Sequence, residues 1–212
     1  MLIVLFGPPG AGKGTQAAPV ADRLGLPKLA TGDVLRAAVR DGTPRGLEAK
    51  AAMDRGDLVP DDVILAIMEE TLSMPEARNG AILDGVVRTT GQAEGLAKML
   101  KRLGKQVDYV LDFNVPDEEL VRRLSGRTVC EKCQTPYTGR EPGTKCDRCG
   151  GTLIRRKDDD PQAVRNRLAV YREQTAPVLD WYRQQKVNIV TIDAVGTPED
   201  VTKRALAAIE GR

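Results

Sequence analysis

A glycine-rich turn with one lysine, residues 7–15, is the part of this chain best suited to hold phosphate groups. It reads Gly-Pro-Pro-Gly-Ala-Gly-Lys-Gly-Thr and lies between an apolar run and a helix-like stretch. Successive backbone N–H groups of such a turn can point at phosphate oxygens, and Lys13 can reach the β- and γ-phosphates. The strict P-loop pattern fails by one residue, because Gly14 separates Lys13 from Thr15. A strand-to-helix turn without a ligand is the alternative, which the order of strand, glycines, lysine and threonine disfavours.

All the cysteines fall in two Cys-x-x-Cys pairs, Cys130 with Cys133 and Cys146 with Cys149, separated by twelve residues. Two such pairs match a tetrahedral site for a structural zinc ion, whose four protein ligands leave no open position for chemistry. Iron is the other metal that four thiolates suit. Disulfides are a weaker interpretation in a cytoplasmic chain, and a redox pair does not need a second copy. We therefore predict a structural zinc ion that holds a small segment together.

Composition limits the classes of function. The 212-residue chain contains no histidine, which removes His-dependent catalytic triads and His-ligated metal sites. The net charge is +2 and aromatic residues make up 3%, so neither bulk basicity nor base-stacking side chains favour nucleic acid. The longest apolar run, near residues 1–6, is too short to span a bilayer and carries no basic leader. We expect a cytoplasmic globular protein without nucleic-acid or membrane partners.

Apolar strands and amphipathic helices alternate along much of the chain. Four apolar runs suit strands buried on both faces of a parallel sheet: residues 2–6, 81–83, 107–113 and 187–192. Three stretches have helical periodicity: residues 61–73, 161–185 and 198–210. Asp160 with Pro161 is a typical helix start, and Pro177 is expected to kink the same helix. The alternation predicts an α/β fold with right-handed crossovers.

Two stretches interrupt this order. Residues 31–59 are helical and polar and contain no strand, whereas residues 127–159 are rich in Gly, Pro, Cys and basic residues. Neither pattern fits a layer of the main sheet, so both stretches are predicted to be insertions into it.

Together with further motifs, the glycine-rich turn and the cysteine pairs resemble the adenylate kinase family, in its long bacterial form with a zinc-bearing lid. The further motifs are Thr31-Gly32-Asp33 with Arg36, Gly42-Thr43-Pro44, residues 53–60, Leu83-Asp84-Gly85 with Arg88-Thr89, Gln92-Ala93-Glu94, Arg123 with Gly126-Arg127, Arg156 with Asp158-Asp159, and residues 165–168, 175–177 and 193–198. The match extends from residue 1 to about residue 210.

The resemblance implies a P-loop nucleoside monophosphate kinase fold. Its core is a five-stranded parallel sheet flanked by helices, with a helical NMP-binding insertion and a small zinc-bearing lid. The implied core domain comprises residues 1–29, 60–125 and 160–212, the NMP-binding domain residues 30–59, and the lid residues 126–159. The implied activity is reversible phosphoryl transfer from Mg·ATP to AMP giving two ADP, for nucleotide homeostasis, in a monomer.

The resemblance also implies the site residues. Those for ATP are Gly10, Ala11, Gly12, Lys13, Gly14, Thr15, Arg123, Arg127, Pro136, Tyr137 and Gly196. Those for AMP are Thr31, Arg36, Asp57, Leu58, Val59, Gly85, Val86, Val87, Arg88, Gln92, Arg156 and Arg167. The implied catalytic residues are Lys13, Asp84, Arg88, Arg123, Arg156 and Arg167, with Asp84 positioning Mg²⁺ through water.

The chemistry of phosphoryl transfer agrees with this composition. The reaction depends on positioning and charge neutralisation rather than on a proton-transferring base, which suits a chain without histidine. Arginine can clamp phosphate oxygens with two parallel hydrogen bonds, although any single arginine is more often a solvated surface charge. The motif match favours the clamp for Arg36, Arg88, Arg123, Arg156 and Arg167.

Several of these residues have simpler structural interpretations. Thr31 could cap the helix that begins near Asp33, and Gln92 could be a surface helix residue. Asp158 and Asp159 could cap the helix after them, contact arginines as the family resemblance implies, or do both.

One loop departs from the family pattern. The family usually reads Asp-Gly-Phe-Pro-Arg, whereas Val86-Val87 stands between Gly85 and Arg88 here. Losing the proline and the aromatic ring changes the loop expected to present Arg88 to AMP. Two alternatives therefore stay open: a kinase for UMP/CMP or GMP, and an inactive nucleotide-binding homologue. Residues 57–59 and Gln92 favour AMP, and the retained Lys13 favours activity.

Overall fold

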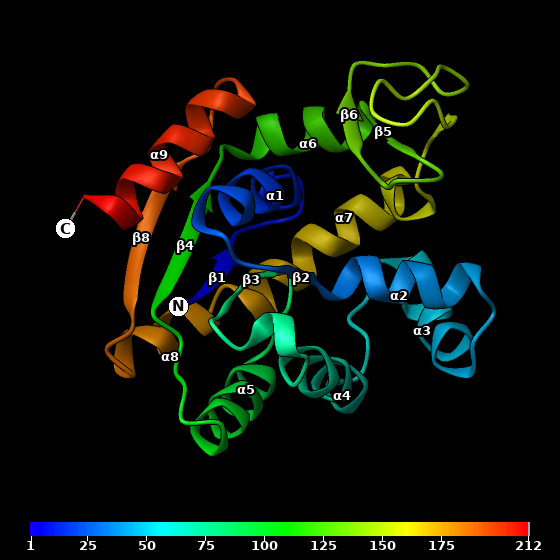
Figure 1. Cartoon of the computed structure of the whole chain (residues 1–212). Helices are drawn as coiled ribbons and strands as arrows, with labels where there is room; N and C mark the ends of the chain where they lie inside the picture. The colour runs from blue at the N-terminus through cyan, green and yellow to red at the C-terminus, as the bar shows by residue number, and fades with distance from the viewer. Residues whose placement is uncertain (212) are drawn as a thin grey trace.

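A computed structural model describes residues 1–211, apart from the side chain of Arg45, so Arg212 of the predicted core domain lies outside the described residues. The main strands are β1 (Leu2–Phe6), β2 (Lys28–Ala30), β3 (Ala81–Asp84), β4 (Tyr109–Asn114) and β8 (Asn188–Asp193). Within the described residues they form one five-stranded parallel sheet in the order β2-β3-β1-β4-β8 (Figure 1). The predicted parallel α/β core is confirmed.

Helices cover both faces of the sheet because successive side chains of a strand point to opposite sides. On β1, Leu2, Val4 and Phe6 pack into one core with α4 (Asp61–Leu72), α5 (Thr90–Arg102) and α8 (Val178–Gln184). The alternate residues Ile3 and Leu5 pack into a second core. That core includes α1 (Lys13–Leu24), α6 (Asp117–Ser125), α7 (Pro161–Val170) and α9 (Pro198–Glu210). Each buried aliphatic side chain stabilises the fold by about 1.5–3 kcal/mol.

The helix predicted over residues 161–185 is interrupted just before Pro177, where a kink was expected. α7 ends at Val170, a wider π-turn covers Tyr171–Thr175, and α8 begins at Val178, just after Pro177. Proline has no N–H to continue the helical ladder, which explains the break. The widened turn lets the Thr175 hydroxyl donate to the carbonyl of Arg88 at 2.8 Å, so the kink supports the loop after β3.

The two interrupting stretches are insertions, as predicted. The first forms the antiparallel pair α2 (Thr31–Arg40) and α3 (Pro44–Arg55). The helices approach so closely that a Cβ on Gly46 would lie 2.1 Å from the carbonyl oxygen of Ala38. The second forms a small antiparallel sheet of β6 (Pro136–Thr138), β5 (Arg127–Cys130) and β7 (Leu153–Ile154). Figure 1 shows both insertions on the same side of the main sheet.

Short elements complete the description. Strand β2 has three half-buried residues at the edge of the sheet, too short and too mixed for a sequence pattern to reveal it. Single 3₁₀ turns cover η1 (Pro75–Ala77) and η2 (Lys157–Asp159). Helix α1 continues through Pro19 without a break. In the part of the chain that is described, no helix combines the length and the apolar character that crossing a bilayer requires.

Candidate active site and metal centre

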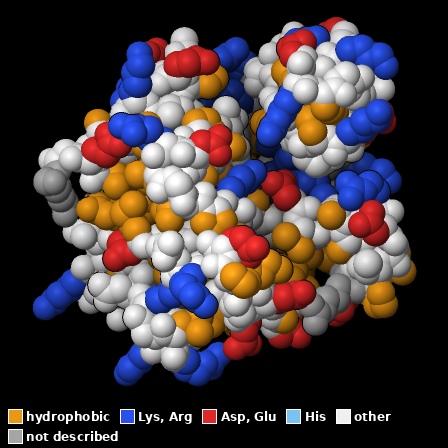
Figure 2. Space-filling model, in the orientation of Figure 1, with side chains coloured by type: hydrophobic (Ala, Val, Ile, Leu, Met, Phe, Trp, Pro, Cys, Tyr) orange, Lys and Arg blue, Asp and Glu red, His pale blue; other side chains and the backbone are white. Residues whose placement is uncertain are grey.

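A large cleft opens where the carboxyl ends of the central strands meet the two insertions. In parallel α/β proteins this edge of the sheet is the usual place for a ligand. Figure 2 shows the lobe that contains β5–β7 set apart from the body, with Lys and Arg side chains along the boundary. The carboxylates lining the cleft are Asp33, Asp84 and Glu119. The more numerous cations are Lys13, Lys28, Arg36, Arg88, Arg122, Arg123, Arg127, Arg156 and Arg167.

The glycine-rich turn forms one wall of the cleft between β1 and α1. Gly7 has a φ of 132°, and a Cβ there would lie 2.6 Å from the carbonyl oxygen of Phe113, so only glycine fits. Gly12, with a φ of 93°, precedes the first turn of α1. The Lys13 ammonium donates to the carbonyl oxygens of Gly7 and Pro8 at 2.6 and 2.9 Å. These bonds hold the turn in the shape of an anion cradle at a helix N-terminus.

Burial leaves several cations of the cleft short of countercharge. Desolvation is the largest effect on Lys13 and lowers its pKa to about 7, although the Asp84 carboxylate opposes this shift. Arg88 is an exposed residue that lines the cleft, and partial desolvation there, followed by the nearby charge of Arg167, lowers its pKa to about 10. Desolvation and the charge of Arg36 likewise lower the pKa of Arg156 to about 9. An anion bound among these groups would be strongly favoured.

Two guanidinium groups also hold unpaired buried N–H groups. Among the described side chains, three buried polar atoms lack a hydrogen-bond partner, and two of them are the Nε atoms of Arg36 and Arg156. Both residues line the cleft. A buried donor without a partner costs about 1–3 kcal/mol, so these atoms indicate where oxygen atoms of a ligand belong.

The acidic pair before α7 contacts arginines. Arg127 donates to Asp159 at 2.7 Å through its Nε, and Arg167 lies 3.1 Å from the carboxylates of both Asp158 and Asp159. The carboxylate of Asp160 accepts from the backbone N–H of Gln162 at 2.9 Å and is the actual cap of α7. The arginine-contact interpretation of Asp158 and Asp159 is therefore confirmed, and the capping interpretation is wrong.

A second recess lies between α2, α3, the start of α4 and the loop after β3. Of the residues predicted for AMP, it is lined by Thr31, Arg36, Asp57, Leu58, Val59, Gly85, Arg88, Gln92 and Arg167. Four of these, Arg36, Gly85, Arg88 and Arg167, also line the large cleft. The two cavities therefore meet at three cations.

The simpler interpretations of Thr31 and Gln92 are wrong. The Thr31 hydroxyl donates to the carbonyl of Gly85 at 2.9 Å and caps no helix, because the cap position of α2 is Ala30. Gln92 is 1% exposed rather than on the surface. Its amide oxygen accepts from the backbone N–H of Arg88 at 2.8 Å. Both side chains hold the Gly85–Arg88 loop in place.

The remaining predicted residues divide between the large cleft and the core. All those predicted for ATP line the cleft: Gly10, Ala11, Gly12, Lys13, Gly14, Thr15, Arg123, Arg127, Pro136, Tyr137 and Gly196. Arg156 lines the cleft, not the recess. Val86 and Val87 are 2% and 3% exposed and belong to the hydrophobic core, so they do not line the recess. Val87 instead lines a smaller neighbouring pocket beside Gly85 and Arg88, and Val86 lines one beside Thr31.

A hard divalent cation suits the carboxylates beside the glycine-rich turn. Burial raises the pKa of Asp84, whose carboxylate lies close to the turn, since a Cβ on Gly14 would be 3.3 Å from its Oδ2. Asp33 and the hydroxyl residue Thr15 line the same cleft. Oxygen ligands of this kind, combined with phosphate oxygens, are what Mg²⁺ prefers.

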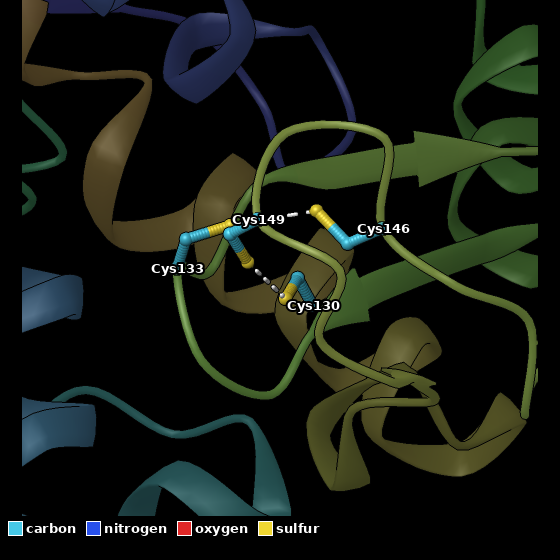
Figure 3. Close-up of side chains that lie close together, drawn as sticks. All are labelled: Cys130, Cys133, Cys146 and Cys149. Carbon is cyan, nitrogen blue, oxygen red and sulfur yellow. Dashed lines mark hydrogen bonds between the residues drawn. The ribbon is translucent and has the colours of Figure 1, made fainter.

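The four cysteines converge in the second insertion, as Figure 3 shows. Their sulfur atoms all lie within 4.8 Å of one another, with Cys130 and Cys149 3.4 Å apart and Cys133 and Cys146 3.6 Å apart. A tetrahedral zinc site with Zn–S bonds near 2.3 Å separates its sulfurs by about 3.8 Å. The arrangement can bind a metal ion with little adjustment.

The backbone forms the same kind of turn at each of the two cysteine pairs. The N–H of Gln134 donates to the carbonyl of Cys130 at 3.0 Å, and the N–H of Gly150 donates to the carbonyl of Cys146 at 2.8 Å. Gln134 and Gly150 both have a positive φ, 58° and 69°. Cys130, Cys146 and Leu153 are the buried residues of this small core, so the sulfur cluster takes the place of apolar packing.

Sequence reasoning missed three residues near the site. Asp61, which starts an apolar helix, accepts hydrogen bonds from Gln92 and Thr89. Asn166 on α7 donates to the carboxylate of Asp57 at 2.6 Å and so joins α7 to the end of α3. Lys28 lines the cleft from the edge strand. The roles of Asp61 and Asn166 depend on partners that are distant in sequence, so no local pattern indicates them. Lys28 lies on a strand too short for its sequence pattern to predict.

Comparisons with known proteins give one consistent result. A family model described as adenylate kinase matches residues 5–187. An adenylate kinase of Gemmatimonas aurantiaca is 64% identical over 211 residues, which cover 99% of either chain. Adenylate kinases of Salinispora tropica and Methanosarcina barkeri are 47% and 46% identical over 213 residues, covering 99% of this chain and 98% and 99% of theirs.

The lowered pKa of Lys13 predicts proton uptake on ATP binding. The free side chain loses its proton above about pH 7, whereas a bound phosphate favours the charged ammonium. ATP affinity should therefore fall as the pH rises from about 7 towards the ordinary lysine value of 10.5. Titration calorimetry at pH 8.5, in two buffers of different ionisation enthalpy, measures the uptake. Lys13→Met is the control, and equal uptake by both proteins would contradict the assignment.

Removal of the metal should destabilise the second insertion selectively. With a chelator, or in Cys130→Ser with Cys149→Ser, we expect a lower midpoint of thermal unfolding, because the sulfur cluster is the core of this segment. Hydrogen exchange should speed up in residues 127–154 and stay slow in residues 7–15. Identical unfolding curves with and without chelator would show that no structural metal is present.

Proposed function

The chain belongs to the adenylate kinase family, and from that premise we propose how its own residues carry out the family's reaction. Its activity is reversible phosphoryl transfer from Mg·ATP to AMP, which gives two ADP. Neither a kinase for other nucleoside monophosphates nor an inactive homologue receives support from the comparisons. We propose which site residues bind ATP, which bind AMP and which contact the transferred phosphoryl group.

The observation that supports this proposal best is that the large cleft and the recess meet at shared cations. ATP occupies the large cleft, with its phosphates on the glycine-rich turn and its base near Gly196, while AMP occupies the smaller recess. The transferred phosphoryl group then lies at the junction, beside Arg36, Arg88 and Arg167. In-line transfer needs donor and acceptor oxygens held on opposite sides of phosphorus, and two cavities that meet at one point supply that geometry.

The cations neutralise charge that develops on the transferred group. Lys13 serves the β- and γ-phosphates of ATP, and Arg123, Arg127 and Arg156 approach from α6, β5 and the residues after β7. Arg123 donates to the carboxylate of Glu119 and to the carbonyl of Ala194 at 2.7 and 2.9 Å, and these bonds hold its guanidinium at the cleft. Bound Mg²⁺, positioned by Asp84 through water, supplies further charge neutralisation between the phosphates of ATP.

We propose three domains. Residues 1–29, 60–125 and 160–212 form the core, residues 30–59 form the NMP-binding domain, and residues 126–159 form the lid. The lid carries Arg127 and Arg156, and the NMP-binding domain carries Thr31 and Arg36. Movement of both domains towards the core assembles the cations around the phosphates and excludes water that would otherwise hydrolyse ATP. The contact between Asn166 and Asp57 supports a closed position of the NMP-binding domain.

Zinc is the metal that we propose for the cysteine cluster, because four thiolates in a tetrahedral arrangement are its usual structural site. The metal keeps the lid rigid, so that movement is confined to its hinges. We also propose a cytoplasmic monomer. Free thiols poised for a metal suit a reducing compartment, and a monomer is the state that the family resemblance implies.

A panel of nucleoside monophosphates tests the activity. With Mg·ATP as donor, kcat/KM for AMP should exceed that for UMP, CMP and GMP by at least about tenfold, because an adenine edge must pair with the hydrogen-bonding groups of the recess. A coupled assay of ADP formation measures each reaction. Preference for another monophosphate would contradict the assignment of AMP.

Arg156 should contribute strongly to the rate. Arg156→Lys keeps the positive charge but loses the fork that binds two phosphate oxygens, so kcat should fall about 100- to 1000-fold. Arg155→Lys is the matched control, because the neighbouring Arg155 is exposed and lines neither cavity. A kcat for Arg156→Lys within a few-fold of that for Arg155→Lys would remove Arg156 from the catalytic residues.

A further inference from the structure

We propose that Asp61 is a specificity-determining positioning residue, which fixes the orientation of the Gln92 amide so that the recess selects a 6-aminopurine over a 6-oxopurine monophosphate. The inference rests on the proposed function, because it requires AMP in the recess that Gln92 lines. It assigns a role to a residue that touches no substrate and acts through its neighbour.

The amide of Gln92 is held from both ends. Its nitrogen donates to Oδ1 of Asp61 at 2.8 Å, and its oxygen accepts from the backbone N–H of Arg88 at 2.8 Å. The second carboxylate oxygen of Asp61 accepts from the Thr89 hydroxyl at 2.9 Å. That hydroxyl in turn accepts from the backbone N–H of Gln92 at 3.0 Å and caps α5. Four groups from α4, α5 and the loop after β3 thus form one closed network.

The network permits only one orientation of the amide. An ionised carboxylate can only accept hydrogen bonds, and a backbone N–H can only donate one. If the Gln92 amide were turned over, its oxygen would face the carboxylate of Asp61 and its nitrogen would face the N–H of Arg88. Both hydrogen bonds would be lost at a side chain that is 1% exposed, where unpaired polar groups are costly.

The fixed amide has one unused capacity at each end. Its oxygen can accept one more hydrogen bond, and its nitrogen can donate one more. The 6-amino group and N1 of adenine offer a donor beside an acceptor, which matches this pair. A 6-oxopurine, as in IMP or GMP, offers an acceptor beside an N1–H donor and matches only the overturned amide. By fixing the orientation of the Gln92 amide, the Asp61 carboxylate makes the recess selective for the 6-amino group and N1 of adenine.

Asp61 also lies in the first turn of α4, where any carboxylate stabilises a helix. Asp62, the next residue, shares that helical role, but it is exposed and belongs to no contact with Gln92. Asp62→Asn is therefore a matched control, since it removes the same charge from the same turn and leaves the network intact.

The test compares AMP with IMP in Asp61→Asn, whose new amide can donate as well as accept. We expect the ratio of kcat/KM for AMP to that for IMP to fall about tenfold, through a higher KM for AMP, which is the effect of one mispaired buried hydrogen bond. The KM for ATP, which binds in the large cleft and not in the recess, should stay within about twofold of wild type. Asp62→Asn should keep the wild-type ratio, and Asp61→Ser repeats the test if Asp61→Asn does not fold.

Gln92→Ala separates this inference from the proposed function. If Asp61 acts through Gln92, adding Asp61→Asn to Gln92→Ala should leave the AMP to IMP ratio unchanged. An equal loss for AMP and IMP in Asp61→Asn, or a further fall of the ratio in the double variant, would overturn the role of Asp61 alone. An unchanged KM for AMP in Gln92→Ala would overturn the placement of AMP in the recess as well.

Discussion

Positive charge concentrated in a partly buried cleft is the constraint on which the rest of this structure depends. Lys13 and Arg156 have lowered pKa values because burial disfavours their charged forms more than nearby carboxylates favour them. Such an arrangement is unfavourable in a protein alone. It becomes favourable when the phosphates of two nucleotides enter, so the protein is complementary to a ligand-bound, closed state.

The fold makes this concentration of charge tolerable. The parallel sheet directs its strand ends to one edge, where the glycine-rich turn and the loop after β3 present backbone N–H groups and cations together. Asp158 and Asp159 lie between Arg127 and Arg167 and neutralise part of the charge between the lid and α7. The polar network of Asp61, Thr89 and Gln92 fixes the loop that carries Arg88. Stability at the site therefore depends on carboxylates that do not touch substrate.

The sequence predicts the helices and strands of this molecule better than the contacts between residues that are far apart in the chain. Apolar runs identified four strands, and the start of α7 at Pro161 and the interruption at Pro177 followed from proline chemistry. The three-residue strand β2 had too little pattern, and only the family resemblance implied it. Spacing alone predicted the cysteine cluster. The contact between Asn166 and Asp57 had no signal, because it joins residues 109 positions apart through a single hydrogen bond.

Thermal unfolding with a bisubstrate compound, two adenosines joined by a chain of five phosphates, tests the central claim most directly. Because the phosphates supply the missing countercharge, the compound at a hundredfold excess over its Kd should raise the unfolding midpoint by about 5 to 10 °C. Adenosine, which fills the base pockets but brings no charge, should raise it far less at the same concentration. Equal shifts from both ligands, or none from the bisubstrate compound, would contradict the account.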